Sequence, residues 1–158
     1  MVTQHNYFET KVNYTGIDEV TGKQVKLSDS YLIDALSFSE AEARTIKEVE
    51  PFMSGEFSVE AVKRSNVYEV FPETEPTESD LWFKLKIDFI VLDKEKRTEK
   101  HISSNIIVEA DSIEMAITNL KLGMRGTMSD YEVVSVTKTG IVGVIGWVEE
   151  RKEKEDEN

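Results

Sequence analysis

The chain has no cysteine and only two histidines, His5 and His101. Without a thiolate it cannot form a disulfide, an iron–sulfur cluster, a thiolate zinc site or a cysteine nucleophile. The two histidines lie far apart in different predicted elements, so only carboxylates could bind a metal, and we predict no metal and no cofactor. No apolar run approaches the roughly 20 residues that span a bilayer, and the polar start has no signal-peptide shape. These absences predict a cytoplasmic protein.

Catalytic signatures are missing as well. The segment Gly123–Gly126 lacks the lysine and serine or threonine of a phosphate-binding loop, and nothing matches a nucleophile elbow, a paired-histidine metal helix or a calcium loop. The acidic residues Asp18, Glu19 and Asp93 are expected to be solvated caps of hairpin turns. His101 has serines nearby, but alternating residues of one strand rarely form a triad. We therefore predict that the protein is not an enzyme.

Charge is abundant and uneven. Charged residues make up 32% of the 158 residues and hydrophobic residues 39%, with a net charge of −12, which is typical of a folded, water-soluble protein. Residues 1–75 carry 7 basic and 14 acidic side chains, whereas residues 76–148 carry 9 and 11. Within residues 81–101 the basic side chains are in slight excess. The overall charge argues against nucleic-acid binding, but the second half has a local basic surface.

Alternating apolar residues predict half-buried strands over residues 7–14 and 82–89. Each is followed by a turn and a returning strand, over 25–35 and 100–110. The first turn, 18–23, has Gly22 at its positive-φ position. The second turn has no glycine, so we expect it to have a different geometry.

A helix is predicted after each strand pair. Ser37 and Glu40 fit a capping box, and Asp111–Glu114 is expected to cap the second helix in the same way. Pro51 and Gly123 are expected to end the two helices. Two valine-rich strands joined by a short turn follow each helix, over 57–62 and 67–71 in the first half and over 131–136 and 141–147 in the second.

The strand-strand-helix-strand-strand pattern occurs twice, about 75 residues apart. Tyr7–Tyr14 matches Trp82–Phe89, and Tyr31–Phe38 matches Ile106–Ile113. The sequence predicts an α+β fold in which a duplicated unit, related by pseudo-twofold symmetry, forms antiparallel sheets with two helices. We expect one compact domain over 1–148, with repeats over 6–71 and 81–147 and a proline-punctuated linker over 72–80. We expect residues 149–158 to be a disordered acidic tail.

The polar faces of the two opening strands are the candidate binding surface. Alternation places Trp82, Lys84 and Lys86 on one face, and Tyr7 and Lys11 on the corresponding face of the first copy. Single-stranded nucleic acids bind such surfaces because bases stack on aromatic rings while cations contact the phosphates. We therefore predict an accessory protein that binds nucleic acid, with single-stranded DNA as the ligand. The second hairpin would extend the surface with Lys94, Lys96, Arg97 and Lys100.

Other interpretations remain open. Tyr7 and Trp82 could instead pack under the linker or against the other copy, with the lysines guarding a sheet edge. The net charge of −12 favours an acidic protein-interaction module or DNA mimic that binds a DNA-processing enzyme.

A weaker alternative is a small-ligand enzyme with carboxylates of raised pKa between the copies. The acidic tail could recruit a replication protein. No membrane partner is expected, and the oligomeric state stays open.

Four segments carry a family resemblance. They are the opening Asn6–Val12, the run Tyr31–Arg44, the patch Pro51–Phe57 and the stretch Gly123–Glu132. With these segments the chain, up to about Ile145, resembles an uncharacterised domain-of-unknown-function family of Bacteroides-type bacteria and of their phages and mobile elements. The resemblance implies a phage or mobile-element setting in the cytoplasm. It implies no established activity and no catalytic residues.

Overall fold

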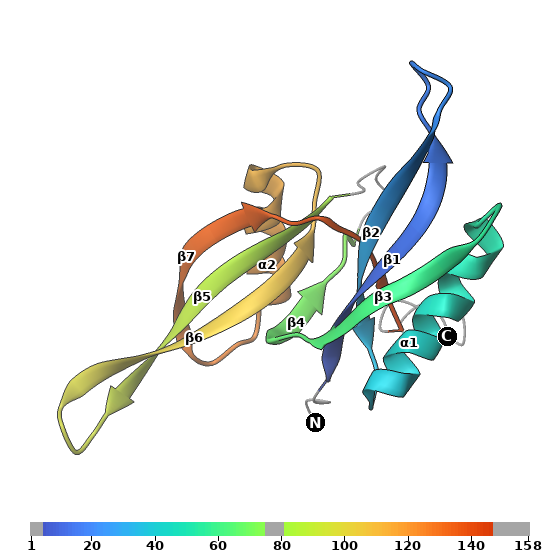
Figure 1. Cartoon of the computed structure of the whole chain (residues 1–158). Helices are drawn as coiled ribbons and strands as arrows, with labels where there is room; N and C mark the ends of the chain where they lie inside the picture. Colours follow the sequence, from blue (N-terminus) through green and yellow to red (C-terminus); the bar gives the residue numbers. More distant parts are fainter. Residues whose placement is uncertain (1–4, 75–80, 147–158) are drawn as a thin grey trace, which may run out of the picture. The chain divides into compact units, whose positions relative to one another are not determined.

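The computed structural model describes residues 5–74 and 81–146, and the predicted tail and most of the predicted linker lie outside them. In the first half of the described chain the predicted element order is observed (Figure 1). The elements of this half are β1 Tyr7–Ile17, β2 Gln24–Asp34, α1 Phe38–Val49, a 3-10 turn at Glu50–Phe52, β3 Phe57–Arg64 and β4 Val67–Phe71.

The second half repeats this order without the 3-10 turn. Its elements are β5 Trp82–Asp93, β6 Thr98–Glu109, α2 Ile113–Gly123, β7 Asp130–Lys138 and β8 Ile141–Ile145. The fold is therefore α+β, as the sequence predicts. Among the described residues, neither helix is long and apolar enough to cross a membrane.

The strands form two four-stranded sheets, each within its own compact unit. The first unit contains the residues up to Ser65 and those from Gly140 onward, and the second contains Asn66 to Thr139. The strand order is β3-β1-β2-β8 in the first sheet and β4-β6-β5-β7 in the second. The chain thus passes from one unit to the other at Ser65 and back at Thr139, and each unit is described separately below.

The last strand of each half of the chain belongs to the same sheet as the first three strands of the other half. β8 pairs parallel with β2, with Ser30 opposite Ile141 and Ile33 opposite Ile145. β4 pairs parallel with β6, from Val67 opposite Asn105 onward. The expectation of purely antiparallel sheets is therefore wrong, and both sheets are mixed. Alternation shows which side of a strand is apolar, but it does not identify the strand's partner.

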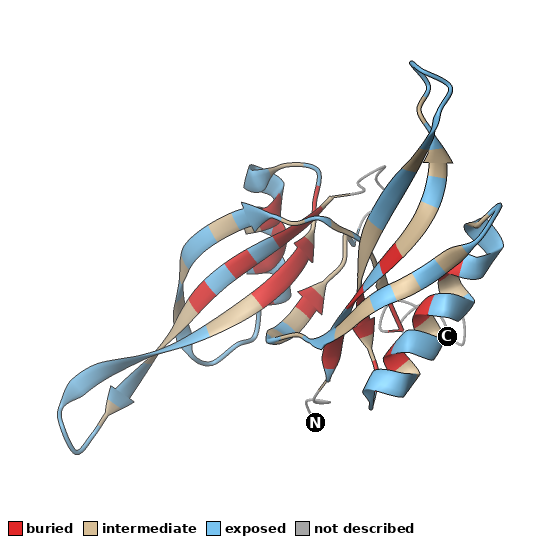
Figure 2. Ribbon diagram, in the orientation of Figure 1, coloured by how far each residue is buried: buried red, intermediate tan, exposed pale blue. Residues whose placement is uncertain are grey.

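One helix covers one face of each sheet. In the second unit, Phe83, Leu85 and Ile87 of β5 form a buried cluster with Ala116 and Leu120 of α2. In the first unit the buried cluster combines residues of β1, β2, α1 and β8 with the residue that follows β2, and Figure 2 shows buried positions on these elements. The residues of this cluster are Phe8, Ile33, Ala35, Ala41 and Ile145. Successive strand residues point to opposite faces, so the residues between these core positions lie on the face away from the helix.

Serine residues start both helices. The Ser37 hydroxyl oxygen accepts a hydrogen bond from the Glu40 N–H at 3.1 Å, and the Glu40 carboxylate accepts one from the Leu36 N–H at 3.2 Å. The Ser112 oxygen accepts from the Met115 N–H at 3.2 Å. The first capping box is confirmed. The box expected over Asp111–Glu114 is wrong by one residue, because Ser112 and not Asp111 is the N-cap. The reciprocal carboxylate bond is part of the first cap alone, because methionine occupies the third helical position of α2.

A buried hydrogen bond between two threonines ties α1 to β1. The Thr45 hydroxyl donates to the Ala41 carbonyl at 2.8 Å, so the Thr10 hydroxyl is the donor in the 3.0 Å bond between the two side chains. Both residues are at most 1% exposed. The residues 75 positions later are Leu85 and Leu120, which are fully buried in the second core. One core thus uses a polar pair where the other uses an apolar pair.

We predict that Thr45→Val destabilises the protein by about 1–3 kcal/mol, because the buried Thr10 hydroxyl loses its acceptor. The double variant T10V/T45V should recover most of this loss, because no unpaired hydroxyl remains. Chemical denaturation measures both free energies of unfolding. Thr118→Val is the control, since Thr118 makes the same bond to the carbonyl four residues earlier on an exposed position of α2. A double variant no more stable than T45V would contradict the prediction.

The two hairpin turns share one geometry. Asp18 Oδ1 accepts from the backbone N–H groups of Val20 and Thr21, and Asp93 Oδ1 accepts from those of Glu95 and Lys96. These aspartates are turn caps, as predicted. The left-handed position is filled by Gly22, with φ 70°, in the first turn and by Arg97, with φ 52°, in the second. The expected difference in geometry is therefore wrong, because Arg97 adopts the conformation that glycine adopts in the first turn.

We predict that Gly22→Ala lowers the free energy of unfolding by about 1 kcal/mol, because a Cβ disfavours positive φ. A Cβ at this position would meet nothing within 4 Å, so the cost comes from the backbone alone. Arg97→Ala is the matched control and should change stability little, because its parent already carries a Cβ. Equal losses in the two variants, measured by denaturation, would refute this explanation.

Candidate functional site

The face of the second sheet away from α2 carries the candidate site. Lys84, Lys86 and Asp88 alternate with the core residues of β5 and lie on this open face. Their cross-strand neighbours are polar as well. Asn105 and Ser135 lie opposite Lys86, and Ser103 and Glu132 lie opposite Asp88.

The two aromatic residues predicted to stack on bases are buried. Tyr7 is 2% exposed and Trp82 is 5% exposed. Ile107, which lies opposite Lys84, is 1% exposed, so burial on this face extends beyond Trp82. A ring that is not accessible cannot stack on a base. The structure thus removes both rings from the candidate surface and leaves its cations.

The predicted cations fall into two groups. Lys11 lies 3.4 Å from Glu60 in an ion pair of the first unit. The other cations are exposed, and in residues 5–74 and 81–146 the structure shows no ion pair for any of them. They are Lys84, Lys86, Lys94, Lys96, Arg97 and Lys100. All six of these predicted cations lie in the second unit.

Four of these six cations lie on a two-stranded arm. The β5–β6 ladder continues to Asp93 and Thr98, whereas β7 pairs with β5 only as far as Ile90. Residues 91–100 thus extend past the end of the β5–β7 pairing as the β5–β6 hairpin (Figure 1). We call this hairpin the second arm. Its tip carries Lys94, Lys96 and Arg97, with Glu95 between the two lysines.

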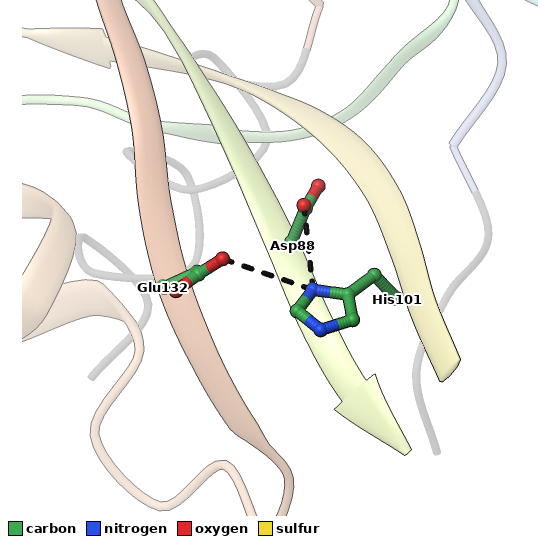
Figure 3. Close-up of side chains that lie close together, drawn as sticks. All are labelled: Asp88, His101 and Glu132. Atoms are coloured by element: carbon green, nitrogen blue, oxygen red, sulfur yellow. Dashed lines mark ion pairs between the residues drawn. The ribbon is translucent and has the colours of Figure 1, made fainter. Parts of the chain in front are cut away.

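Three side chains from neighbouring strands converge where the second arm meets the sheet. Nδ1 of His101 lies 3.6 Å from Oδ2 of Asp88 and 3.7 Å from Oε1 of Glu132. Figure 3 shows both carboxylates directed at this one nitrogen. The donor atoms of the three side chains all lie within 4.8 Å of one another. We call these three residues the His101 cluster.

Two further residues orient the cluster. The Ser103 hydroxyl donates to Oδ1 of Asp88 at 2.7 Å, which leaves Oδ2 to face the imidazole. On the other side of the ring, Nε2 of His101 lies 4.0 Å from Oε2 of Glu99. The sequence prediction missed this cluster, because its members lie on three strands and come together only through their register.

The corresponding region of the first unit has different chemistry. Asn13 lies opposite Ser28 and Ser58, as Asp88 lies opposite Ser103 and Glu132. The Ser28 hydroxyl donates to the Asn13 side chain at 2.7 Å, which matches the bond from Ser103 to Asp88. Lys26 stands 75 positions before His101. The first unit thus repeats the scaffold of the cluster without its histidine and acids.

An open depression of about 630 Å³ lies at this place in the first unit, lined partly by Lys11, Asn13 and Glu60. The Asn13 amide donates to Glu60 at 2.9 Å. This hydrogen bond, and secondly the charge of Lys11, holds the pKa of Glu60 below its usual range. A general acid needs a raised pKa, so this carboxyl does not favour the small-ligand enzyme alternative.

The pKa values of two tyrosines in the first sheet are also shifted. Burial raises the pKa of Tyr14 and of Tyr31, and the nearby Asp29 carboxylate adds to both shifts. An ordinary phenol already has a pKa of about 10. Both side chains are therefore neutral at physiological pH and act as hydroxyl groups.

We predict that Asn13→Ala raises the pKa of Glu60, because the side-chain hydrogen bond from Asn13 is the largest cause of its depression. Lys11→Ala should raise it less. Because the folded-state pKa is lowered, this contribution to stability is present above the unfolded-state pKa and is lost as the pH falls through the folded value. NMR titration of the Glu60 carboxyl carbon measures the shift. An unchanged pKa in the Asn13 variant would contradict this assignment.

The comparisons with known proteins identify a family. Residues 6–147 match the family model DUF4494, described as a domain of unknown function. Because the match spans most of the chain, the protein belongs to this family, and the resemblance to an uncharacterised family is confirmed. No curated protein and no solved structure matches the chain.

Proposed function

We propose that this protein is a non-enzymatic accessory protein that binds nucleic acid through the second unit. The observation that carries the proposal is that six exposed cations, none of them in an ion pair within the described chain, gather on the open face of β5 and on the second arm. We also propose a cytoplasmic location and a phage or mobile-element setting in Bacteroides-type bacteria.

The arrangement of these cations favours contacts to phosphate. Exposed lysine and arginine side chains release counterions when they contact a nucleic-acid backbone, which drives sequence-independent binding. Lys84 and Lys86 are two residues apart on one face of a strand, about 7 Å along it, a distance comparable to the spacing of successive phosphates. A two-stranded ribbon such as the second arm also has the dimensions to enter a major groove.

The burial of Tyr7 and Trp82 removes base stacking from the proposed binding mode. Base stacking was the reason to expect single strands rather than a duplex. With both rings inaccessible, the remaining contacts are electrostatic, and they serve single-stranded and duplex DNA alike. The comparison of the two ligands is therefore part of the test.

We further propose that the chain arose by internal duplication. The support comes from matched details 75 residues apart. The aspartate-capped turns, the serine N-caps and the serine bonds to Asn13 and Asp88 all recur at this spacing. The pseudo-twofold relation between the copies stays a prediction.

Fluorescence anisotropy with a labelled single strand and a labelled duplex tests DNA binding. If all six cations contact phosphates, affinity for the duplex should fall about 10³-fold between 50 and 200 mM salt. The variant K84Q/K86Q should lower the slope of log affinity against log salt by about 1.8 on a duplex or 1.4 on a single strand. The arm variant K94Q/K96Q/R97Q/K100Q should lower it further.

Lys11→Gln is the matched control. Lys11 stands 75 positions before Lys86 but is paired with Glu60, so its removal should leave affinity unchanged. Absence of binding to either ligand at low salt would overturn the proposal, as would binding that neither lysine variant weakens.

The second candidate function is an acidic protein-interaction module or DNA mimic. The net charge of −12 and the excess of 14 acidic over 7 basic residues in positions 1–75 favour it. A DNA-processing enzyme captured by this protein and released by DNA would support this candidate. Binding through the predicted acidic tail belongs to the same proposal, and the tail lies outside the described residues.

A further inference from the structure

We propose that the His101 cluster is a binding site for a divalent transition metal, with Zn²⁺ as the preferred ion. The ligands would be Nδ1 of His101, Oδ2 of Asp88 and Oε1 of Glu132. This inference goes beyond nucleic-acid binding and does not depend on it. It also departs from the expectation that metal could bind through carboxylates alone.

The distances suit a metal of this kind. Zn²⁺ binds imidazole nitrogen and carboxylate oxygen at about 2.0–2.2 Å, so two ligands of a tetrahedral ion lie roughly 3.3–3.6 Å apart. The two separations from Nδ1 of His101 are 3.6 and 3.7 Å. Small side-chain rotations would bring the three atoms onto one ion. Three protein ligands would leave the fourth position to water or to an external group.

The ligand set selects the class of ion. One imidazole and two carboxylates suit Zn²⁺ and similar first-row ions, whereas Mg²⁺ prefers oxygen ligands and keeps most of its waters. An ion would also offset the two neighbouring carboxylates, whose mutual repulsion otherwise opposes this arrangement.

The surrounding residues hold the ligands in place. The three ligands lie on the adjacent strands β6, β5 and β7, and Asp88 and Glu132 are directly opposite each other. The hydrogen bond from Ser103 fixes the Asp88 carboxylate. Glu99 lies on the Nε2 side of His101 at 4.0 Å, beyond hydrogen-bond distance, and its negative charge would favour a proton on Nε2 when Nδ1 binds the metal. Outer contacts of this kind fix the tautomer of histidine ligands.

The first unit supplies two comparisons for the proposed metal site. The corresponding positions in the first unit hold Asn13, Lys26 and Ser58, a set with no imidazole and no carboxylate. The other histidine, His5, lies 2.5 Å from the Asp34 carboxylate in the first unit. His5→Gln therefore removes the second histidine–carboxylate pair and leaves the His101 cluster intact.

Isothermal titration of the tag-free, full-length protein with ZnCl₂, in the absence of nucleic acid, tests the site. We expect one equivalent of Zn²⁺ to bind, and Co²⁺ to bind with a visible absorption spectrum of nitrogen and oxygen ligation. MgCl₂ should give no comparable binding. The variants H101Q and D88N should lose this binding, and S103A should weaken it about tenfold. The H5Q variant should keep it.

Nitrogen-15 NMR of the imidazole gives a second readout, because Zn²⁺ should shift Nδ1 of His101 and leave Nε2 protonated. Circular dichroism of each variant shows that loss of binding is not loss of fold. The proposal is overturned if Zn²⁺ does not bind, or if H101Q and D88N remain folded and bind it like the parent. Binding lost in H5Q and kept in H101Q would place the metal elsewhere and also overturn it. Because DNA is absent, none of these outcomes bears on the proposed function.

Discussion

The structure depends on the parallel pairing of β2 with β8 and of β6 with β4. Without these two strands, β2 and β6 would each present a row of unpaired backbone N–H and C=O groups at a sheet edge. The exchanged strands also complete the cores. Ile145 of β8 belongs to the first buried cluster, and a Cβ at Gly123 of α2 would lie 2.6 Å from the ring of Phe71 in β4. Each half of the chain therefore completes its sheet with a strand from the other half.

Polar side chains gather on the face of the second sheet away from α2, because the core residues of β5 face the helix. The three strands β6, β5 and β7 set the register of this face, and the register alone places Asp88, Ser103 and Glu132 side by side. The basic side chains and the His101 cluster occupy successive parts of the same strands. Bound metal would reduce the negative charge next to Lys86, so the two proposed activities would be electrostatically coupled although each is tested separately.

The sequence predicted the elements well and the site only in part. Alternation around Phe83, Leu85 and Ile87 identified a half-buried strand, and Ser37 identified the start of the first helix, because these signals are local. The same alternation could not distinguish an exposed Trp82 from a buried one, because it assigns a face and not what covers it. The sequence showed His101 only as an isolated histidine, since its partners are 13 residues before it and 31 residues after it.

The sequence by itself determined the order of strands and helices, the aspartate-capped turns, the start of the first helix, and the slight excess of basic residues over 81–101. These features follow from hydrogen bonds and periodicities within a few residues of chain. Only the tertiary structure decided that β4 and β8 exchange sheets, that Tyr7 and Trp82 are buried and that three strands bring His101 to two acids. These features depend on contacts between residues that are far apart in the sequence. The spacing and composition of a short segment do not show which distant segment it will contact.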